Sequence, residues 1–416
     1  MNKVRIVGGG LTGILAAFEA HRLGCRDIEL HERLENLGGV ALPRQTDGLE
    51  LRDGCLYFGP QGDAVRSALE AHGIIFRDFD TRFGSVSAGP GGGLLVGQEF
   101  GGPVLEHGEI EVTGPFGATL GSRLAAYPAG IRTDLETYVR WHLDGADPAG
   151  VHESAAIPLA INRVYPVGAD LDAMVALKRT EPLYDELYAI PRSLWGRTVN
   201  LVASLPAEGF NILFRDLRKR LGDLGVTVNT TSLVSPRQAL RQCEDGEVLV
   251  WAASPTPLFK AAGLATPPLL KKSFTIYSFK AGFEGPLPFY VQNFTARGAV
   301  FRAYLYESCG ETILAAECVR EDEESSLRAD LARLTEPFGA LKLGPMIAAM
   351  NQPRWIYHSA ASVEGLMTLR QKLSAQTEGR FVAGAWEPYS KAEKLAEVNA
   401  SLAAALGAAR QGDRAA

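Results

Sequence analysis

Cysteine is scarce in this sequence. The chain has five cysteines in 416 residues, an odd number with no Cys-x-x-Cys spacing: Cys25, Cys55, Cys243, Cys309 and Cys318. An odd number of cysteines scattered over a long chain argues against a disulfide framework, and the missing Cys-x-x-Cys spacing argues against a zinc knuckle and a redox-active dithiol. The histidines show no metal-ligand spacing either, and we expect no metal site. Such cysteine usage favours a reducing cytoplasm.

Long apolar runs and a charge excess are also missing. No stretch reaches the ~18 uninterrupted apolar residues that a membrane span needs, and the apolar beginning, residues 4–18, is interrupted by four glycines. Lys+Arg 42 against Asp+Glu 48 leaves a net charge of −6, which offers no general attraction to nucleic acid. We therefore expect a cytoplasmic protein with no transmembrane segment, no signal peptide and no nucleic-acid partner.

The remaining composition is that of a globular protein of more than one domain. Apolar residues make up 46% of the chain and charged residues 22%, far from disordered or fibrous compositions. A length of 416 residues exceeds that of one ordinary domain.

The beginning of the chain carries the most informative pattern. The β-rich run Val4–Val7 leads into the turn Gly8–Gly13, which fits G-x-G-x-x-G, and helical apolar spacing follows in residues 14–23. A second β-rich run, residues 27–30, ends just before Glu32. A strand, a glycine turn, a helix, a strand and an acid about 20 residues beyond the glycines form a dinucleotide-binding βαβ unit.

Each residue of the turn has a physical purpose in such a unit. Gly8 allows the tight turn, Gly10 lets the backbone approach a diphosphate, and Gly13 allows close packing of helix on strand. Leu11 and Thr12 open the helix, whose free N–H groups and positive dipole end then face the phosphates.

The acid and the loop after it indicate which dinucleotide is bound. Glu32, followed by Arg33, is placed to accept hydrogen bonds from ribose hydroxyls. The pair Gly38–Gly39 follows closely. A nicotinamide-binding unit does not need this pair, whereas a longer cofactor that folds back over the strand ends needs nearby backbone without side chains. The pattern therefore favours FAD.

Three later regions return to an α/β pattern. The expected elements are a strand and an amphipathic helix in residues 49–76, a helix in 211–224 followed by a buried strand in 247–253, and a short strand in 381–386 followed by an alanine-rich helix in 392–408. Because these regions are far apart in the chain, we expect a discontinuous FAD-binding domain made of residues 1–80, 206–264 and 372–410.

The other regions predict a second domain, residues 81–205 and 265–371. Residues 84–102 are rich in glycine and predict hairpins or a mobile loop, with a surface loop and a functional lid both left open. Residues 121–200 predict short helices, whose aromatic residues we interpret mainly as core: Trp141, Tyr165, Tyr184, Tyr188 and Trp195. Residues 272–319 predict an antiparallel sheet.

One run of that sheet, residues 299–308, shows a clear alternation. Arg302, Tyr304 and Tyr306 share one face, and Phe301, Ala303 and Leu305 share the other. One face must pack, and the other either roofs a cavity or faces water. The predicted fold class is thus α/β, with a Rossmann-like FAD-binding domain and an inserted substrate domain built on an antiparallel sheet plus helices.

These blocks together resemble the FAD-dependent amine oxidases and protoporphyrinogen-oxidase-like flavoproteins, a superfamily with UDP-galactopyranose mutase as a relative. The resemblance covers residues 7–13, Glu32–Arg33, Gly38–Gly39, 225–234 and 381–386 with the following helix. It implies that Gly8, Gly10 and Gly13 hold the pyrophosphate and that Glu32 holds the adenosine ribose. The Val234 backbone would hold the adenine, and Gly384 with its helix would hold the flavin end.

The leading functional hypothesis is an FAD-dependent oxidoreductase that takes a hydride from a C–N, C–O or C–C bond of a small organic substrate. No Cys or His lies in a recognisable attachment motif, so non-covalent FAD is expected. O2, another acceptor or NAD(P)H would be the electron partner. A single G-x-G-x-x-G argues against a pyridine-nucleotide disulfide reductase.

The catalytic residues stay unknown at this level. Weak candidates for lining the substrate cavity are Arg302, Tyr304, Trp386, Tyr389 and Lys272. Each has a structural alternative: an ion pair for Arg302, packing for the aromatic residues, and solvation, which we favour, for Lys272.

Two other functional hypotheses stay open. One is a non-redox flavin-dependent nucleotide-sugar mutase, in which arginines clamp a diphosphate; the candidates are Arg297, Arg302, Arg354 and Arg370. The other is a flavoprotein without enzymatic activity that keeps FAD for structural reasons.

Overall fold

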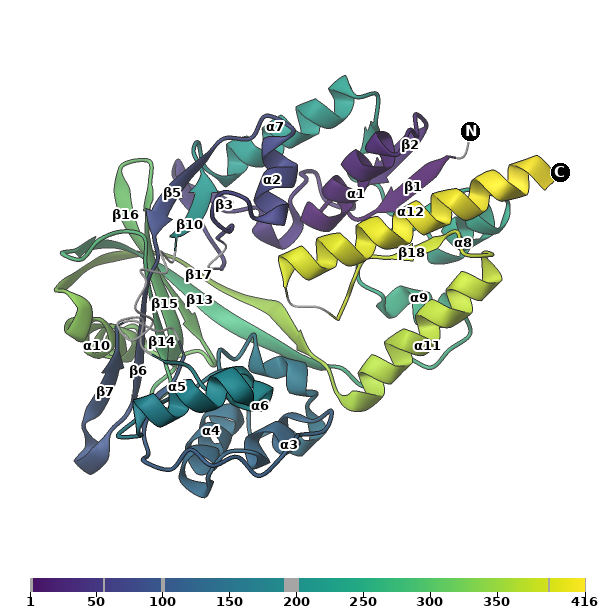
Figure 1. Cartoon of the computed structure of the whole chain (residues 1–416). Coiled ribbons are helices and arrows are strands. Elements are labelled where there is room, and N and C mark those ends of the chain that lie inside the picture. Colours follow the sequence, from purple (N-terminus) through teal and green to yellow (C-terminus); the bar gives the residue numbers. More distant parts are fainter. Residues whose placement is uncertain (1–2, 55–56, 99–101, 191–201, 388–389, 416) are drawn as a thin grey trace.

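The computed structural model describes residues 3–54, 57–98, 102–190, 202–387 and 390–415. One half of it is built on a five-stranded sheet with the order β11-β2-β1-β12-β18, in which all neighbouring strands are parallel (Figure 1). Its strands are β1 (Val4–Val7), β2 (Ile28–His31), β11 (Thr227–Asn229), β12 (Val248–Trp251) and β18 (Phe381–Ala383). Three distant regions of the chain thus form one sheet.

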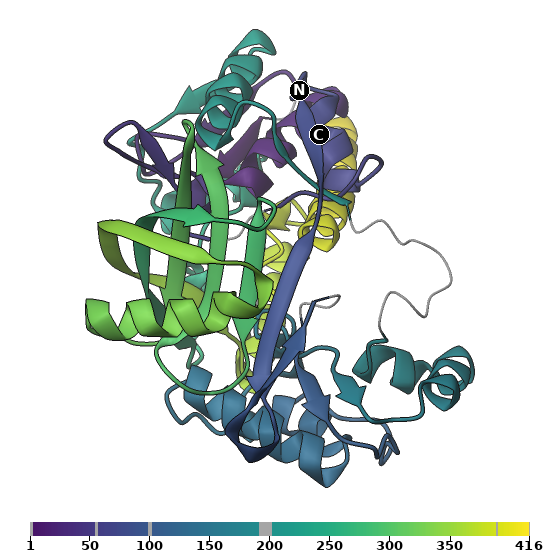
Figure 2. The same cartoon turned by 90° about the vertical axis from the view of Figure 1, so that its left-hand side faces the viewer.

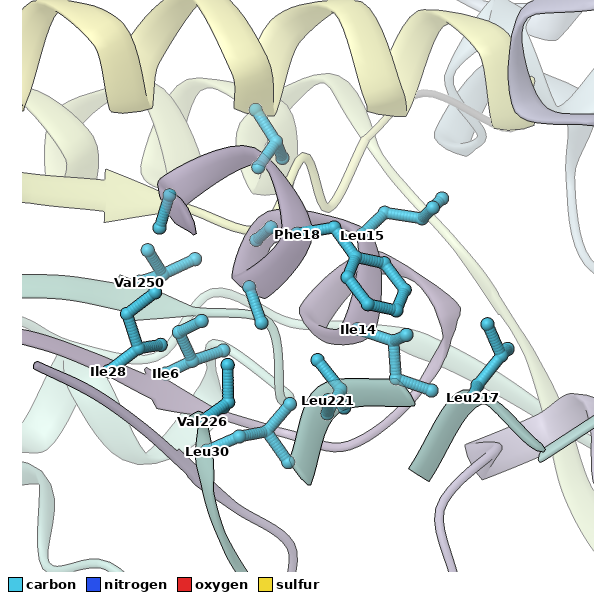
Figure 3. Packing of buried hydrophobic residues seen from close by; sticks show 14 of the residues in the cluster. Ile6, Ile14, Leu15, Phe18, Ile28, Leu30, Leu217, Leu221, Val226 and Val250 are labelled. Carbon is cyan, nitrogen blue, oxygen red and sulfur yellow. The ribbon is translucent and has the colours of Figure 1, made fainter. Parts of the chain in front are cut away.

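Helices cover both faces of this sheet. The cluster in Figure 3 joins Ile6, Ile28 and Val250 of the sheet to helices on one face: α1 (Leu11–Arg22), α2 (Ala64–Glu70), α7 (Phe210–Asp223) and α12 (Lys391–Ala415). Val7 and Trp251 point to the opposite face, toward α8 (Pro236–Glu244), α9 (Thr256–Ala261) and α11 (Ala360–Gln376). This doubly wound arrangement confirms the predicted Rossmann-like fold class.

The second half is built on a seven-stranded sheet with the order β17-β13-β16-β15-β14-β6-β7. Its strands are β6 (Arg82–Ala88), β7 (Leu94–Gly97), β13 (Leu270–Phe283), β14 (Phe289–Asn293), β15 (Val300–Ser308), β16 (Glu311–Cys318) and β17 (Leu341–Tyr357). Only the β14–β6 pairing is parallel among the described strands of this sheet. The antiparallel sheet predicted for residues 272–319 is present, and the glycine-rich region forms the hairpin β6–β7.

The alternation predicted along β15 decides what each face of this sheet covers. Ala303 and Leu305 pack under α10 (Glu324–Thr335), whereas Tyr304 and Tyr306 pack on the opposite face. Phe301 departs from the prediction, because a register shift between Val300 and Arg302 places it with a different cluster, beside Phe274.

Short helices form a third layer below the sheets (Figures 1 and 2). They are α3 (Leu120–Ala125), α4 (Ala129–His142), α5 (Leu171–Thr180) and α6 (Pro182–Leu187), accompanied by the strand pair β8 (Val104–Glu106) and β9 (Tyr165–Val167). The helices predicted in residues 121–200 are therefore present as far as residue 190. Tyr188 is buried and Trp141 and Tyr184 pack against the same cluster, as the packing interpretation expected, whereas Trp195 lies outside the described residues.

The strand expected within residues 49–76 does not join the parallel sheet. It is β4 (Leu49–Leu51), whose one partner among the described strands is β3 (Arg44–Thr46), in a small hairpin. Leu49 and Leu51 pack against Tyr304 and Tyr306 of the second sheet instead. A separate strand pair, β5 (Phe76–Asp80) with β10 (Val202–Pro206), lies nearby. The apolar face of β4 is therefore buried by the other half of the molecule, which local sequence does not reveal.

No described helix combines the length and the apolar character required to cross a bilayer.

Candidate functional site

The glycines of the first turn serve two different needs. Gly8 has a φ of 109°, and a Cβ there would lie 2.8 Å from the Ala253 nitrogen. A Cβ on Gly13 would lie 1.9 Å from the Gly8 carbonyl oxygen. These two glycines are required by the fold itself, because helix and strand approach too closely for a side chain. Gly10 differs, since a Cβ there would meet nothing within 4 Å. Its backbone borders open space in which a ligand fits.

The beginning of α1 offers free hydrogen-bond donors. Gly10 is the N-cap, no side chain caps the helix, and the Ile14 amide bonds the Gly10 carbonyl at 3.0 Å. The amides of Leu11 and Thr12 therefore lack intrahelical acceptors, as at every helix start. Together with the positive end of the helix dipole they suit a diphosphate.

Glu32 lies at the end of β2 and holds the turn in place. Its side chain is buried, with 8% exposed, and its two carboxylate oxygens accept the amides of Gly9 at 2.7 Å and Leu34 at 2.8 Å. Each carboxylate oxygen can accept a second bond, so capacity for ribose hydroxyls remains. Arg33 beside it is exposed. The sequence pattern identified the position of this acid but not its structural bonds to the turn.

The second glycine pair lies directly against the first turn. The Gly38 amide bonds the Gly9 carbonyl at 2.8 Å, and Gly38 forms a bridge with Gly10. A Cβ on Gly39 would lie 3.3 Å from the Gly10 Cα. Both have positive φ, 124° for Gly38 and 56° for Gly39. Two glycine segments thus form one surface without side chains, longer than the first turn alone.

The loop that contains Val234 is bound to the same edge. The Ser232 amide bonds the Glu32 carbonyl at 2.8 Å, and the Thr231 amide bonds the Leu34 carbonyl at 3.0 Å. Leu34 and Leu233 are exposed here, with 50% and 82% of their surface accessible. Exposed apolar side chains beside a polar loop are a suitable setting for a flat heterocycle.

The C-terminal block reaches the same edge from the other side. A Cβ on Gly384 would lie 2.6 Å from the Ala252 Cα, so this glycine has a packing reason of its own. Trp386 donates its Nε1 proton to the Ala253 carbonyl at 3.1 Å, which gives it a structural contact. Helix α12 begins a few residues later, where the Ser390 side chain accepts the Glu393 amide at 3.3 Å. Tyr389 lies outside the described residues.

A small cavity of about 50 Å³ lies between the beginnings of α1 and α12. Its lining is mostly apolar and includes Leu11, Thr12, Leu15, Lys391 and Lys394. Burial lowers the pKa of the Lys394 ammonium group. Two lysines and two helix N-termini meet here, and the carboxylates of Glu387 and Glu397 lie close to Lys394.

The remaining substrate-cavity candidates are engaged in contacts within the protein. Arg302 forms an ion pair with Glu317, which is fully buried, and the Tyr304 hydroxyl donates to the Arg52 carbonyl at 2.6 Å. The solvated state that we favoured for Lys272 is wrong, because its side chain is buried and paired with Asp144. Tyr304 therefore faces the α/β half of the molecule.

A buried polar chain near Arg302 was not recognised in the sequence. The Tyr290 hydroxyl donates to Gln292 at 2.6 Å, whose amide donates to the Tyr138 hydroxyl at 2.9 Å, and His142 contacts the Tyr357 hydroxyl at 3.2 Å. Burial first, and then Lys272 and Arg302, hold the pKa of His142 well below its usual value. The partners lie up to 215 residues apart, so no local pattern could indicate them.

Of the mutase arginines, two are already paired. Arg302 binds Glu317, and Arg370 binds Glu387 and Glu397. Arg297 is exposed, and the Arg354 side chain lies outside the described part of the structure. Among described residues, no group of three or more His, Cys, Asp or Glu side chains could hold a metal ion.

Comparison with known proteins agrees with this geometry. Residues 6–71 match the model of an NAD(P)-binding Rossmann-like domain. No curated protein matches the sequence. Among solved structures, reduced UDP-galactopyranose mutase superposes with a TM-score of 0.66 at 12% identity, covering 98% of this chain and 96% of that one. A putative protoporphyrinogen oxidase from Exiguobacterium sp. gives 0.62 at 14% identity over 96% and 98%, and a putrescine oxidase variant gives 0.56 at 13% over 98% and 99%.

The chain has the fold of the FAD-dependent amine-oxidase-like flavoproteins. The similarity extends over nearly the whole chain and confirms the resemblance seen in the separated sequence blocks. At 12–14% identity these superpositions concern the amine-oxidase-like fold and not the substrate.

Proposed function

We propose that this protein is an FAD-dependent oxidoreductase, amine-oxidase-like, acting on a small organic substrate. The observation that carries the proposal is the contact of Gly38–Gly39 with Gly10, which extends the side-chain-free surface beyond one glycine turn. A cofactor that reaches beyond the first glycine turn would need such an extension. The solved structures of this fold include putrescine oxidase and a putative protoporphyrinogen oxidase, which supports the same class.

The residues of the site divide along the cofactor. The beginning of α1 with Gly10 would hold the diphosphate, Glu32 with Arg33 would face the adenosine ribose, and the backbone at Val234 would face the adenine. Gly39, Gly384 and the beginning of α12 would surround the flavin end. When bound, non-covalent FAD would supply the hydride acceptor, with O2 or NAD(P)H as the electron partner.

The protein's own contribution is electrostatic and steric. Negative charge on a reduced flavin would be stabilised by a helix N-terminus, and the beginning of α12 with Lys391 would supply this stabilisation. The Lys391 ammonium also donates to the Tyr57 carbonyl at 2.6 Å, which fastens the segment after β4 to α12.

The division of labour proposed here follows the two halves of the fold. Residues 1–80, 206–264 and 372–410 would bind FAD, and residues 81–205 and 265–371 would bind substrate. We further propose a cytoplasmic enzyme, in line with the scarce and scattered cysteines.

The test begins with the purified protein. Acid release followed by chromatography should yield FAD, and anaerobic mixing with amines, amino acids, nucleotide sugars and nicotinamide cofactors should bleach the flavin with its true reductant. Release of FMN or NAD, or no retention after incubation with FAD, would contradict the proposal.

A flavin-dependent nucleotide-sugar mutase is the second candidate, because the reduced mutase superposes with a TM-score of 0.66. The pairing of Arg302 and Arg370 with carboxylates speaks against a diphosphate clamp built from them. Isomerisation of a nucleotide sugar without net oxidation would favour this candidate. A flavin that no compound reduces would favour a structural role for FAD.

A further inference from the structure

A second cavity, of about 230 Å³, lies where the two halves of the molecule meet. None of its lining residues belongs to the glycine turns, the Val234 loop or the beginning of α12. Its lining comes from the residue after β4, from β5, from the end of β15, from Leu205 of β10 and from the segment Leu287–Pro288. Small-molecule sites form preferentially at such domain junctions.

Arg52 projects into this cavity in a fixed orientation. Its guanidinium lies 4.5 Å from the centre of the Tyr306 ring and 5.1 Å from that of Phe210. The Tyr306 hydroxyl accepts the Arg52 amide at 2.8 Å and donates to the Glu50 carbonyl at 3.2 Å, so the ring itself is held. Aromatic rings cover guanidinium faces and leave the N–H edge for a hydrogen-bonding partner.

That edge has no anionic partner within the described residues. The neighbouring arginines do have one, since Arg44 pairs with Asp53 at 2.7 Å and Arg66 pairs with Asp78. The Arg52 Nε atom is buried and bonds to no described group. The terminal nitrogens of Arg52 are therefore the donors that would meet an anionic ligand in the cavity.

Arg77 adds a second cation to the same cavity. It is exposed on β5 and forms no ion pair with any residue that the structure describes. Of the two carboxylates in the lining, Asp78 is already bound by Arg66, which also pairs with Glu70, and this leaves Glu307. The lining thus holds two arginines without a described ion pair and one carboxylate that no described cation binds.

We propose that this junction cavity binds a small molecule through an oxyanion, a phosphate or a carboxylate group, held by Arg52 and Arg77. The planar N–H edge of a guanidinium matches two oxygens of either group. A hydroxyl or amino group on the same ligand would face Glu307. The ligand would contact β5 and β15 together and so would stabilise the junction of the two halves by mass action.

The experiment titrates two probes into the FAD-saturated protein at constant ionic strength, inorganic phosphate in one series and succinate in the other. Calorimetry and thermal unfolding record binding. Wild type should bind at least one probe saturably, and the preferred probe identifies the oxyanion. Arg77→Gln and Arg52→Gln should each weaken binding about tenfold or more, as expected for losing a charged hydrogen bond. Arg132→Gln, an exposed arginine on α4, is the matched control and should bind as wild type does.

Three results would overturn the proposal. These are no saturable binding of either probe to the FAD-saturated wild type, equal binding by wild type and the variants, and binding that appears only in a parallel titration of the FAD-free protein, which would place the anion at the α1 turn. If Arg52→Gln does not fold, the exposed Arg77→Gln decides. If the protein retains no FAD, the same titration on the FAD-free chain and Arg77→Gln still decides, so the two proposals fail separately.

Discussion

Replacing Gly10 by alanine should remove FAD while leaving the fold intact. Gly10 has a φ of −73° and a ψ of 178°, an extended conformation that any residue adopts. Its new Cβ would meet no protein atom within 4 Å. The substitution should therefore not strain the FAD-free protein, and restricting the unfolded chain should stabilise it by about 0.4–1 kcal/mol.

The cost should fall on the cofactor instead. The added methyl group would occupy the space in front of the uncapped amides of Leu11 and Thr12, where we place the diphosphate. Loss of one or more hydrogen bonds to a charged group is worth about 1.5–3 kcal/mol, or roughly 10- to 150-fold in the FAD dissociation constant.

Gly13→Ala is the matched comparison within the same turn. Its Cβ would lie 1.9 Å from the Gly8 carbonyl oxygen, so helix and strand must separate, at a cost of about 1–3 kcal/mol or more. FAD titration by flavin fluorescence and urea unfolding of the FAD-free protein measure the two effects. Gly10→Ala with FAD affinity within about twofold of wild type would refute the proposed diphosphate position. Lower stability of the FAD-free Gly10→Ala variant would contradict the open space beside the Gly10 backbone.

Three further predictions test other parts of the structure. Glu32→Ala should weaken FAD retention by about 1.5–3 kcal/mol and also lower the stability of the FAD-free chain, because two turn amides lose their acceptor; unchanged affinity in a folded variant would contradict a ribose contact. Arg302→Ala should destabilise the protein by about 3–5 kcal/mol in urea unfolding, because Glu317 stays buried without its cation. The double variant Arg302→Met/Glu317→Met should recover most of this loss. Equal stability of the single and the double variant would show that the two residues are not coupled. Burial, Lys272 and Arg302 lower the pKa of His142, so below about pH 6.5 the unfolded chain binds a proton that the folded protein does not bind, and the free energy of unfolding falls with falling pH. His142→Gln should reduce the slope of this fall by up to about 1.4 kcal/mol per pH unit. An identical slope in the variant would contradict a buried neutral His142.

Local pattern was sufficient for the parts of this protein that short-range geometry governs. The strand, glycine turn and helix at residues 4–22 follow from the order of β-rich residues, glycines and helically spaced apolar residues. In the structure, close backbone contacts explain why positions 8 and 13 must be glycine. The opposite faces of Ala303 and Tyr304 follow from the two-residue period of a strand. The resemblance of the separated blocks to the amine-oxidase-like flavoproteins is likewise confirmed at the level of fold.

Tertiary structure decided everything that depends on partners distant in the chain. The leucines of β4 could be buried either in the parallel sheet or under Tyr304. The second sheet, some 250 residues later in the chain, provides the surface that buries them. Lys272 is solvated or paired according to the position of Asp144, which α4 sets. Arg52 has no sequence signal at all, since its rings and its cavity come from α7, β5 and β15. Backbone periodicity shows which way a side chain points, but burial and pairing depend on what the rest of the chain brings opposite to it.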